Sequence, residues 1–282
     1  MNYLLYNPSA NNGTGEQMKS QALGVLQRKY GHFKAIDITV NPTQAFILGL
    51  KPDDFLVVIG GDGTLNKLVN LVRGQIPTCK AYVYKVGKGN DFLLDNKDYV
   101  KDDLLEINGM MQHLPTLSAN GKTRLFVNGV GFGLDGEVCA ITEHYKKLGQ
   151  YEKINYAKIV TKLIMNYKRT KATIVADGKT YTFDKTWMVA IMHGKYYGNG
   201  MLVAPKQNRK SGKVTVVAIH SASKLKALTR FKKLFTTGIT EYQDMVTSIE
   251  AKQVSVTFNE PRAIQIGGDL IPRVTSLRVN AH

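Results

Sequence analysis

The run Phe55-Leu56-Val57-Val58-Ile59-Gly60-Gly61-Asp62-Gly63-Thr64 decides the fold of this chain. Its first five residues predict a buried strand, and the residues from Leu65 onward have the apolar spacing of a helix. Glycines here let the backbone approach a phosphate, and the following helix presents free N–H groups and the positive end of its dipole. Asp62 would repel a phosphate directly, so it implies a Mg²⁺ ion between carboxylate and phosphates. The run therefore predicts a nucleotide-phosphate loop, against the alternative of a tight turn capped by Asp62.

The segments on either side of this loop alternate in the same way. Short β-rich runs and helical stretches follow one another at residues 2–6, 16–30, 35–39, 43–50, 55–59, 65–73 and 81–86. Alternation of this kind predicts a parallel α/β sheet of the Rossmann-like type. We expect this part of the chain, residues 1–117, to form a nucleotide-binding domain.

The chain beyond Leu117 has a different pattern. Closely spaced strands are predicted at 124–130, 171–176, 180–183, 186–192, 214–220, 254–258, 263–266 and 275–279. Helical spacing interrupts them at 151–167 and 223–235. The pattern predicts an antiparallel β-sandwich domain over residues 118–282.

The composition is that of a globular protein with a basic surface. Of 282 residues, 43% are hydrophobic, and Lys and Arg outnumber Asp and Glu by 38 to 22, a net charge of +16. This balance predicts an anionic partner: nucleic acid, an anionic membrane face or a nucleotide polyphosphate. No apolar run reaches the roughly 18 residues of a spanning helix, and the first residues lack a signal-peptide pattern, so we expect a cytoplasmic protein. Cys79 and Cys139 are expected as reduced thiols, because two cysteines cannot form a disulfide framework.

Five motifs, in order along the chain, carry a family resemblance. They are Asn7-Pro8-Ser9, Gly60 to Thr64, Gly87 to Phe92, Phe126 to Asp135 and Tyr196 to Pro205. Together they resemble the diacylglycerol kinase catalytic-domain family, the bacterial-type lipid kinases that are related to sphingosine and ceramide kinases and more distantly to NAD kinases. The resemblance implies an α/β nucleotide domain followed by a β-sandwich lipid domain, with the active site in the cleft. It also implies transfer of the γ-phosphate of ATP to a hydroxyl of a diacylglycerol-like membrane lipid.

The resemblance further implies which residues act. Mg²⁺ is assigned to Asp62 and Asp91, and catalysis to these two aspartates and to Asp269, the candidate base. The family has a glutamate where this chain has Asp269, so the carboxylate is kept on a shorter side chain. A turn residue between two strands is the alternative for Asp269. The implied contacts to ATP are made by Asn7, Pro8, Ser9, Thr39, Gly60, Gly61, Asp62, Gly63, Thr64, Asn66, Gly87, Lys88 and Asn90.

Departures from the family pattern bear on activity. Lys88 replaces the usual Thr or Ser and could reach a phosphate as a point charge. Ser211-Gly212 stands where an Asp-Gly pair usually helps to form a structural Mg²⁺ loop, and an aspartate expected shortly before the second domain falls at Pro115 or Thr116. These changes keep open a nucleotide-binding lipid sensor with weakened catalysis, and the shared GGDGT run keeps open an NAD kinase.

One further glycine pattern, from Gly131 to Gly136, formally matches a GxGxxG dinucleotide loop. No compact βαβ unit with an acidic residue at the end of its second strand follows. We therefore expect no dinucleotide site there.

Basic residues gather at 146–171 and at 206–213, which suits docking on an anionic bilayer, where each contributes roughly 1 kcal/mol. In residues 224–235 the apolar side chains share one helical face and the basic ones lie opposite. That face predicts either a membrane-lying helix or an ordinary core-packed helix. We expect peripheral association with the inner membrane face and no nucleic-acid partner, since no such module signature occurs. A two-fold homodimer is the commonest default.

Overall fold

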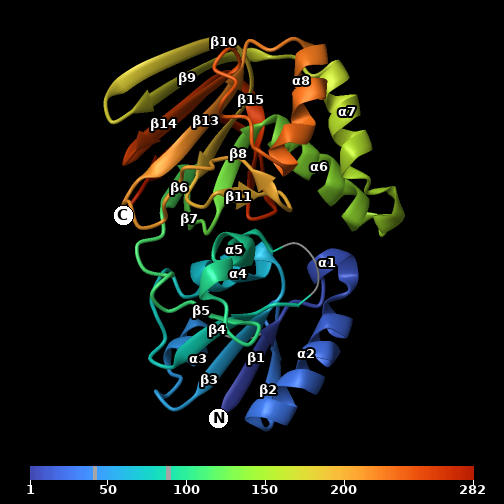
Figure 1. The fold of residues 1–282 in the computed structure, drawn as a ribbon, viewed down its shortest axis with the longest axis vertical. Helices are drawn as coiled ribbons and strands as arrows, with labels where there is room; N and C mark the ends of the chain where they lie inside the picture. Colours follow the sequence, from blue (N-terminus) through green and yellow to red (C-terminus); the bar gives the residue numbers. More distant parts are fainter. Residues whose placement is uncertain (41–42, 87–89) are drawn as a thin grey trace. The chain divides into compact units, whose positions relative to one another are not determined.

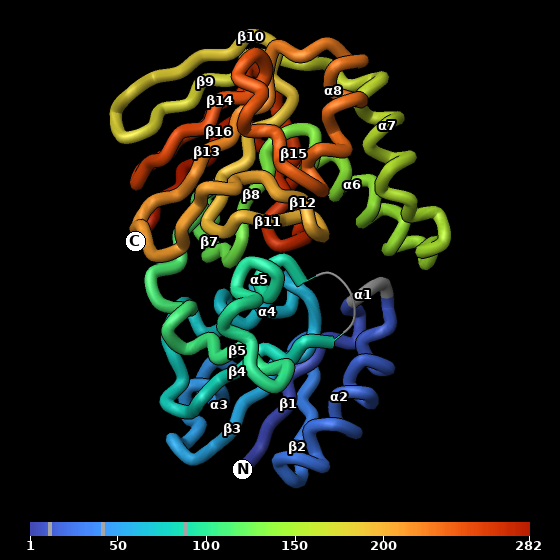
Figure 2. Tube along the Cα trace, viewed as in Figure 1, coloured from blue at the N-terminus to red at the C-terminus, as the bar shows by residue number. Residues whose placement is uncertain are grey.

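The computed structural model describes residues 1–40, 43–86 and 90–282. The chain forms two compact units, residues 1–114 and 115–282, shown as ribbon and tube in Figures 1 and 2. The second unit begins with strand β6 (Thr116–Ala119), in which Leu117 pairs with Val279 near the end of the chain. Thr116 and Leu117, which we predicted in the first domain, are therefore part of the second sheet.

The first unit is built on a five-stranded sheet, which confirms the predicted parallel α/β fold. Its strands lie in the order β2-β1-β3-β4-β5, and the first four are parallel. The last strand, which the sequence did not predict, runs antiparallel, with Tyr82 opposite Glu106. The strands are β1 (Asn2–Tyr6), β2 (Phe33–Asp37), β3 (Phe55–Ile59), β4 (Lys80–Tyr84) and β5 (Leu104–Glu106).

Short connections and helices join these strands. The helices are α1 (Ala10–Gly13), α2 (Gly15–Tyr30), α3 (Gln44–Leu48), α4 (Asp62–Leu71), α5 (Asp91–Asp95) and the 3₁₀ turn η1 (Lys97–Tyr99). Helix α2 packs Ala22 and Leu26 against Leu4 and Val57 of the sheet. Several predicted boundaries were wrong: the predicted strand 81–86 is β4, which ends at Tyr84, and the predicted helix 43–50 is α3, which ends at Leu48. Helix α4 begins at Asp62 rather than at Leu65, and β2 ends at Asp37, which leaves Thr39 in the turn that follows.

The second unit is an antiparallel β-rich domain, as predicted. Strands β14-β13-β10-β8-β15-β16-β6-β7 follow one another in the sheet, and β9 pairs with both β10 and β15. Its buried side chains form a core of aliphatic residues around Phe132 and Phe258, whose rings meet edge to face. The remaining strands are β7 (Lys122–Leu125), β8 (Gly129–Gly133), β9 (Thr170–Ala176), β10 (Lys179–Met192), β13 (Val214–His220), β14 (Val246–Ala251), β15 (Gln253–Ile266) and β16 (Asp269–Asn280), with a separate hairpin of β11 (Tyr196–Tyr197) and β12 (Met201–Leu202).

Four strand predictions in this unit need correction. The strand predicted at 275–279 is part of β16, which already begins at Asp269. Residues 180–192 form one long strand, β10, whose register shifts between Phe183 and Thr186, and residues 254–266 likewise form one bulged strand, β15. Each of these strands pairs with β9 along its first half and with β8 along its second half, because the bulge bends it. The predicted strand 124–130 is instead two strands, β7 and β8.

Three helices, α6 (Leu134–Lys147), α7 (Tyr156–Asn166) and α8 (Lys224–Phe231), lie beside one another on one side of this sheet (Figure 1). The 3₁₀ turn η3 (Lys232–Phe235) continues α8, and the 3₁₀ turn η2 (Tyr151–Lys153) lies in the connection between α6 and α7. Helix α6 was not predicted, and the predicted helix 151–167 is confined to η2 and α7. In the described part of the chain, no helix is long and apolar enough to cross a membrane.

Candidate functional site

The loop after β3 requires glycine for a steric reason. Gly60 has a φ of 141°, and a Cβ atom at this position would collide with the Thr64 hydroxyl one turn along α4. Gly61 precedes the helix in an extended conformation, and its carbonyl accepts a hydrogen bond from the Thr64 amide at 2.9 Å. The turn is therefore tight enough for α4 to begin at Asp62, with Gly63 in its first turn.

The Asp62 carboxylate holds the start of a second helix. Its two oxygens accept hydrogen bonds from the backbone amides of Asp91 and Phe92, both at 2.9 Å. Those amides belong to the first turn of α5, where a helix offers free N–H groups and favours a negative charge. Asp62 thus joins the glycine loop to the Asn90-Asp91 segment.

Asn90 completes this connection from the other side. Its side-chain oxygen accepts a hydrogen bond from the Leu93 amide at 2.9 Å and caps α5, while its side-chain nitrogen donates to the Gly60 carbonyl at 3.2 Å. Asp91 itself is only 2% exposed. Asn90, Asp91, Gly60 and Asp62, four predicted site residues, are therefore brought together. Gly87 and Lys88, also predicted to contact ATP, lie outside the described residues.

The donor atoms at this site suit Mg²⁺. Asp62 and Asp91 supply carboxylates, a ligand type that Mg²⁺ prefers. Asn66 lies one turn along α4 from Asp62, and its buried Oδ1 has no hydrogen-bond partner. Mg²⁺ usually takes one or two carboxylates together with water and substrate phosphates. The residues fit an ion that binds with a nucleotide. Among residues 1–40, 43–86 and 90–282, no cluster of three His, Cys, Asp or Glu side chains could hold a metal ion unaided.

The Asn7 loop after β1 is equally compact. The Asn7 side chain is buried and accepts a hydrogen bond from the Ser9 amide at 3.0 Å, and the Gly15 amide donates to the Pro8 carbonyl at 3.2 Å. A Cβ atom on Gly15 would collide with the carbonyl oxygen of Asn7. The loop consequently lies directly against the start of α2, as a phosphate-binding loop requires.

Thr39 is close to this loop, but its hydroxyl has a local partner. The Thr39 amide and hydroxyl both donate to Asp37 Oδ1 at 2.7 Å. The Ile38 amide donates to the Tyr6 carbonyl at 2.9 Å, which ties the turn to the end of β1. Because β2, β1, β3 and β4 are parallel neighbours, their following loops all lie along the same edge of the sheet. The Asn7 and Gly60 loops flank the point where the chain order reverses, the usual ligand-binding position in such sheets.

Asp269 belongs to the second unit. It is the first residue of β16, paired with Ile266 across the turn formed by Gly267 and Gly268, which both have positive φ angles. The carboxylate lies 3.6 Å from the Arg124 guanidinium, and both side chains are partly exposed. The Cys139 thiol of α6 donates to the Gly268 carbonyl at 3.3 Å. Asp269 is thus at the start of a strand, next to a turn, with a basic neighbour.

Sequence reasoning missed the role of Asp135. The Tyr197 hydroxyl donates to its carboxylate at 2.6 Å, and a Cβ atom on Gly131 would occupy the place of that carboxylate. Burial raises the pKa of the Asp135 carboxyl to about 6, although the hydrogen bonds from Tyr197 and from the Gly136 amide lower it. Gly136 packs on the backbone of Ala263 in β15. The glycines of the GxGxxG-like pattern therefore allow close packing rather than dinucleotide binding. Their spacing in the sequence was the feature that could have indicated the buried Asp135 carboxylate.

The loop at 205–213 contains no acidic residue and is held by Arg209. The Arg209 guanidinium donates to the Val127 carbonyl and to Asn128 Oδ1, both at 2.6 Å. Asn128 also accepts the amides of His193 and Gly194 at its carbonyl, so the loop, the 126–128 connection and the end of β10 are joined. Without a carboxylate in the loop, the residues do not fit the structural Mg²⁺ that the resemblance implied there.

Comparison with known families agrees with this geometry. The profile of the diacylglycerol kinase catalytic domain matches residues 2–109, and that of the YegS C-terminal NAD kinase beta sandwich-like domain matches residues 128–274. The chain belongs to the diacylglycerol kinase catalytic-domain family. The two matched regions follow the order of the two units seen here, an α/β unit with the glycine loop followed by an antiparallel β-rich unit.

Proteins similar to this chain are found both by sequence and by structure. A protein of Staphylococcus aureus strain JH9, provisionally named a lipid kinase, is 22% identical over 225 residues, which cover 78% of this chain and 72% of that protein. A relative in Staphylococcus carnosus with the same name is 27% identical and covers 71% and 66%. A crystal structure from Bacillus anthracis, provisionally titled a diacylglycerol kinase, covers 100% of this chain and 92% of its own with a TM-score of 0.63 and 18% identity, which shows the common fold.

Proposed function

We propose that this family member is an ATP-dependent lipid kinase that transfers the γ-phosphate to a hydroxyl of a diacylglycerol-like membrane lipid. The observation that carries the proposal is the junction of the Gly60 loop with the Asn90-Asp91 segment through the Asp62 carboxylate. It forms beside the Asn7 loop at the carboxyl edge of the parallel sheet, where nucleotide phosphates bind in folds of this type. Membership of the diacylglycerol kinase catalytic-domain family supports kinase activity.

Each loop has a distinct task in this proposal. The amides at the start of α2 and α4 hold the nucleotide phosphates, and the Asn7, Pro8, Ser9 and Gly60 to Thr64 backbone shapes the loops around them. Mg²⁺, held by Asp62 and Asp91 together with the phosphates, would neutralise their charge. Thr39 lies at one end of the site, where its hydroxyl donates a hydrogen bond to Asp37. Asn90 lies at the other end, where it caps α5.

The transfer step needs a proton acceptor. The lipid hydroxyl oxygen forms a bond to the γ-phosphorus, the bond from that phosphorus to the bridging oxygen of ADP breaks, and the hydroxyl proton passes to the Asp269 carboxylate. The Arg124 guanidinium lies 3.6 Å from this carboxylate, and both side chains are partly exposed. Asp269 is already paired with Arg124 and is one methylene shorter than the glutamate of the family, and these two features favour the alternative of a lipid sensor with weakened catalysis.

The test is transfer of labelled γ-phosphate from ATP with Mg²⁺ to lipid alcohols in anionic micelles, with NAD as a second acceptor. Asp269→Asn and Asp62→Asn are run beside the native chain, with Asp53→Asn, an exposed loop residue, as the matched control. Labelled lipid from the native protein and the control, lost in both site variants, supports the kinase and its base.

Other outcomes select the alternatives. Label in NADP would move the chain to the NAD kinase function. Nucleotide binding without any labelled product, across diacylglycerol, sphingoid, polyprenol and phosphatidylglycerol acceptors, would replace the kinase with the lipid sensor. We further propose that the chain acts in the cytoplasm, peripheral to the inner membrane face, since its charge of +16 favours an anionic surface.

A further inference from the structure

The hairpin between α6 and α7 carries exposed apolar side chains at its tip. We define the α6–α7 tip as residues 148–156, which connect the two helices through η2 and lie away from the sheet (Figure 1). Leu148, Tyr151 and Tyr156 are 55%, 39% and 52% exposed. Single exposed apolar residues are ordinary on a soluble protein, but three within nine residues form a patch that indicates an interaction site.

Leu148 and Tyr151 are not displaced members of the core, whereas burial, together with the nearby Cys139 of α6, raises the pKa of the Tyr156 hydroxyl, so Tyr156 presents only part of its side chain. Helix α7 buries its other face, since Val160 and Ile164 pack in the cluster around Trp187. The tip is also a defined structure: the Asn155 side chain caps α7 by accepting the Lys158 amide at 3.1 Å, and Gly149 has a φ of 69° in the turn after α6. The exposed side chains are therefore presented by a folded hairpin with its inner face already filled.

The surroundings of the tip are basic. Residues 143–162 contain five lysines, all exposed, against two glutamates. Within the described chain, the recorded ion pair among these lysines is Lys147 with Glu143, at 3.6 Å. The lysines at 146, 153, 158 and 162 consequently leave a positive field around the apolar tip. An apolar centre inside a positive rim complements a bilayer whose surface is anionic and whose interior is apolar.

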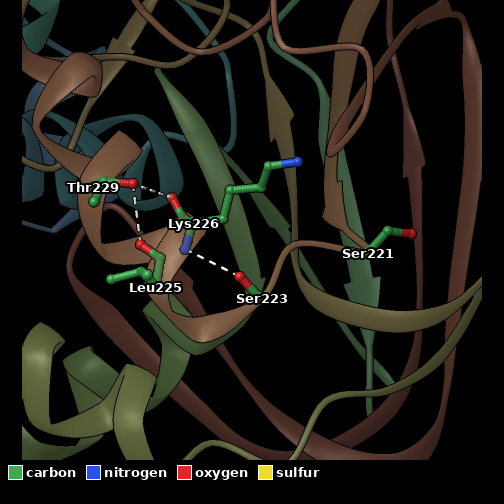
Figure 3. A pocket seen from close by; sticks show the side chains of 5 residues that line it. All are labelled: Ser221, Ser223, Leu225, Lys226 and Thr229. Carbon is green, nitrogen blue, oxygen red and sulfur yellow. Dashed lines mark hydrogen bonds between the residues drawn. The ribbon is translucent and has the colours of Figure 1, made fainter.

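Helix α8, for which the sequence left open a membrane-lying helix and a core-packed helix, is less suitable. Lys226 and Arg230 both pair with Asp244, and Leu228 and Phe231 pack against the core. Its first turn borders an open depression of about 450 Å³ lined by Ser221, Ser223, Leu225, Lys226 and Thr229 (Figure 3). Leu225 is exposed there, but Asp244 pairs with both Lys226 and Arg230 and so reduces the positive charge beside it.

We propose that the α6–α7 tip docks the protein on an anionic phospholipid bilayer, with Leu148, Tyr151 and Tyr156 in the interface and the surrounding lysines at the headgroups. Tyrosine and leucine are suited to this depth, and lysine stems reach from it to the phosphates. The inference deepens the proposed lipid kinase, whose substrate lies in a membrane, but the docking step itself requires no catalysis.

Binding of the full chain to vesicles tests the proposal. Sedimentation is measured with phosphatidylcholine vesicles, with and without phosphatidylglycerol, over a series of salt concentrations. The Leu148→Ser/Tyr151→Ser pair removes apolar contact, and Lys153→Glu/Lys158→Glu reverses charge. Matched controls in the first unit are Val25→Ser/Val40→Ser, both exposed valines, and Lys51→Glu/Lys101→Glu. We expect each tip pair to weaken binding to the anionic vesicles at least about tenfold, and each control pair to leave it nearly unchanged. In Tyr151→Trp, anionic vesicles should shift the new indole emission to the blue, read against the emission of the buried Trp187 in the native chain.

The outcomes separate this proposal from the kinase. Tip variants that bind vesicles like the native chain, or an unshifted emission, would overturn the docking surface. So would a loss of binding to duplex DNA or RNA that leaves vesicle binding intact, since it would assign the patch to nucleic acid. Vesicle binding without phosphoryl transfer would support the docking surface and contradict the kinase. Phosphoryl transfer to micellar lipid without vesicle binding would support the kinase and contradict the docking surface.

Discussion

Asp62 has two separable tasks in this chain. Its carboxylate accepts the amides of Asp91 and Phe92, and the same group is the proposed Mg²⁺ ligand. Hydrogen bonds to a charged group contribute about 1.5–3 kcal/mol, and an amide left without an acceptor adds a desolvation cost. Loss of activity on substitution at this position therefore has a structural part as well as a chemical one.

Asp62→Ala should lower the free energy of unfolding by about 2 kcal/mol or more, because two amides of α5 lose their acceptor. Asp62→Asn keeps one acceptor oxygen and should lose roughly half of that amount. Urea unfolding measures both, beside the exposed control Asp53→Asn. Equal stability of all three variants would mean that α5 is held without Asp62.

Asp135 and His193 should make stability depend on pH in opposite senses. Burial raises the pKa of Asp135 from 3.8 to about 6, so its contribution is full below pH 4 and is lost as pH rises through 6. Burial, together with the nearby Arg209, lowers the pKa of His193 from 6.5 to about 3, so its contribution is present above pH 6.5 and is lost as pH falls toward 3.

Substitution at these two residues gives the corresponding prediction. Asp135→Asn should steepen the loss of stability between pH 6 and pH 4, since the opposing contribution is removed, and His193→Gln should flatten it. Urea unfolding midpoints over that range decide between the variants. Parallel curves for both variants and the native chain would show that neither group titrates between these limits.

At the scale of elements, we expect the 205–213 loop to keep its structure and stability without a bound metal ion. Arg209 supplies a fixed positive charge to the Val127 carbonyl and to Asn128. Chelation of divalent ions should leave the melting temperature of the nucleotide-free protein unchanged. Arg209→Met should lower it by several degrees, because two partly buried oxygens lose their donor, whereas Lys206→Met, an exposed lysine on the same loop, should have a smaller effect. A melting temperature that falls on chelation would place a metal in this loop.

At the scale of the whole molecule, each unit has a core of its own. The residues around Leu4 and Val57 form the core of the first unit, and those around Phe132 and Trp187 form the clusters of the second. Units with separate cores unfold as separate cooperative steps. Calorimetry should therefore resolve two transitions.

Two variants assign these transitions. Asp62→Ala should lower the transition of the first unit, and Gly136→Ala should lower that of the second, because a Cβ atom there would collide with the Ala263 carbonyl of β15. Nucleotide with Mg²⁺ should raise the first transition alone. One transition that both variants shift equally would show that the two units unfold together.

Sequence patterns located some strands and helices accurately and missed or divided others. Strong local patterns located β1, β3, β13 and α2 to within one residue, because an apolar run or a helical period is set by neighbours in sequence. Helix α6 was missed because the glycines before it resemble a turn, and the bulged strands β10 and β15 were read as pairs of shorter ones. Local pattern does not show that a strand continues through a bulge, because its pairing partners lie far away in the chain.

The amino-acid sequence by itself determined the family, the order of an α/β unit and an antiparallel β-rich unit, and the Gly60 loop, since these depend on motifs and periodicities that are local. Only the tertiary structure decided that Asp62 holds α5, that Asp135 is buried against Tyr197, and that Arg209 holds the 205–213 loop. Each of these contacts joins residues 29 to 82 positions apart. Which residues become partners depends on how strands and helices pack in the folded chain. The spacing of residues along the sequence does not indicate this packing.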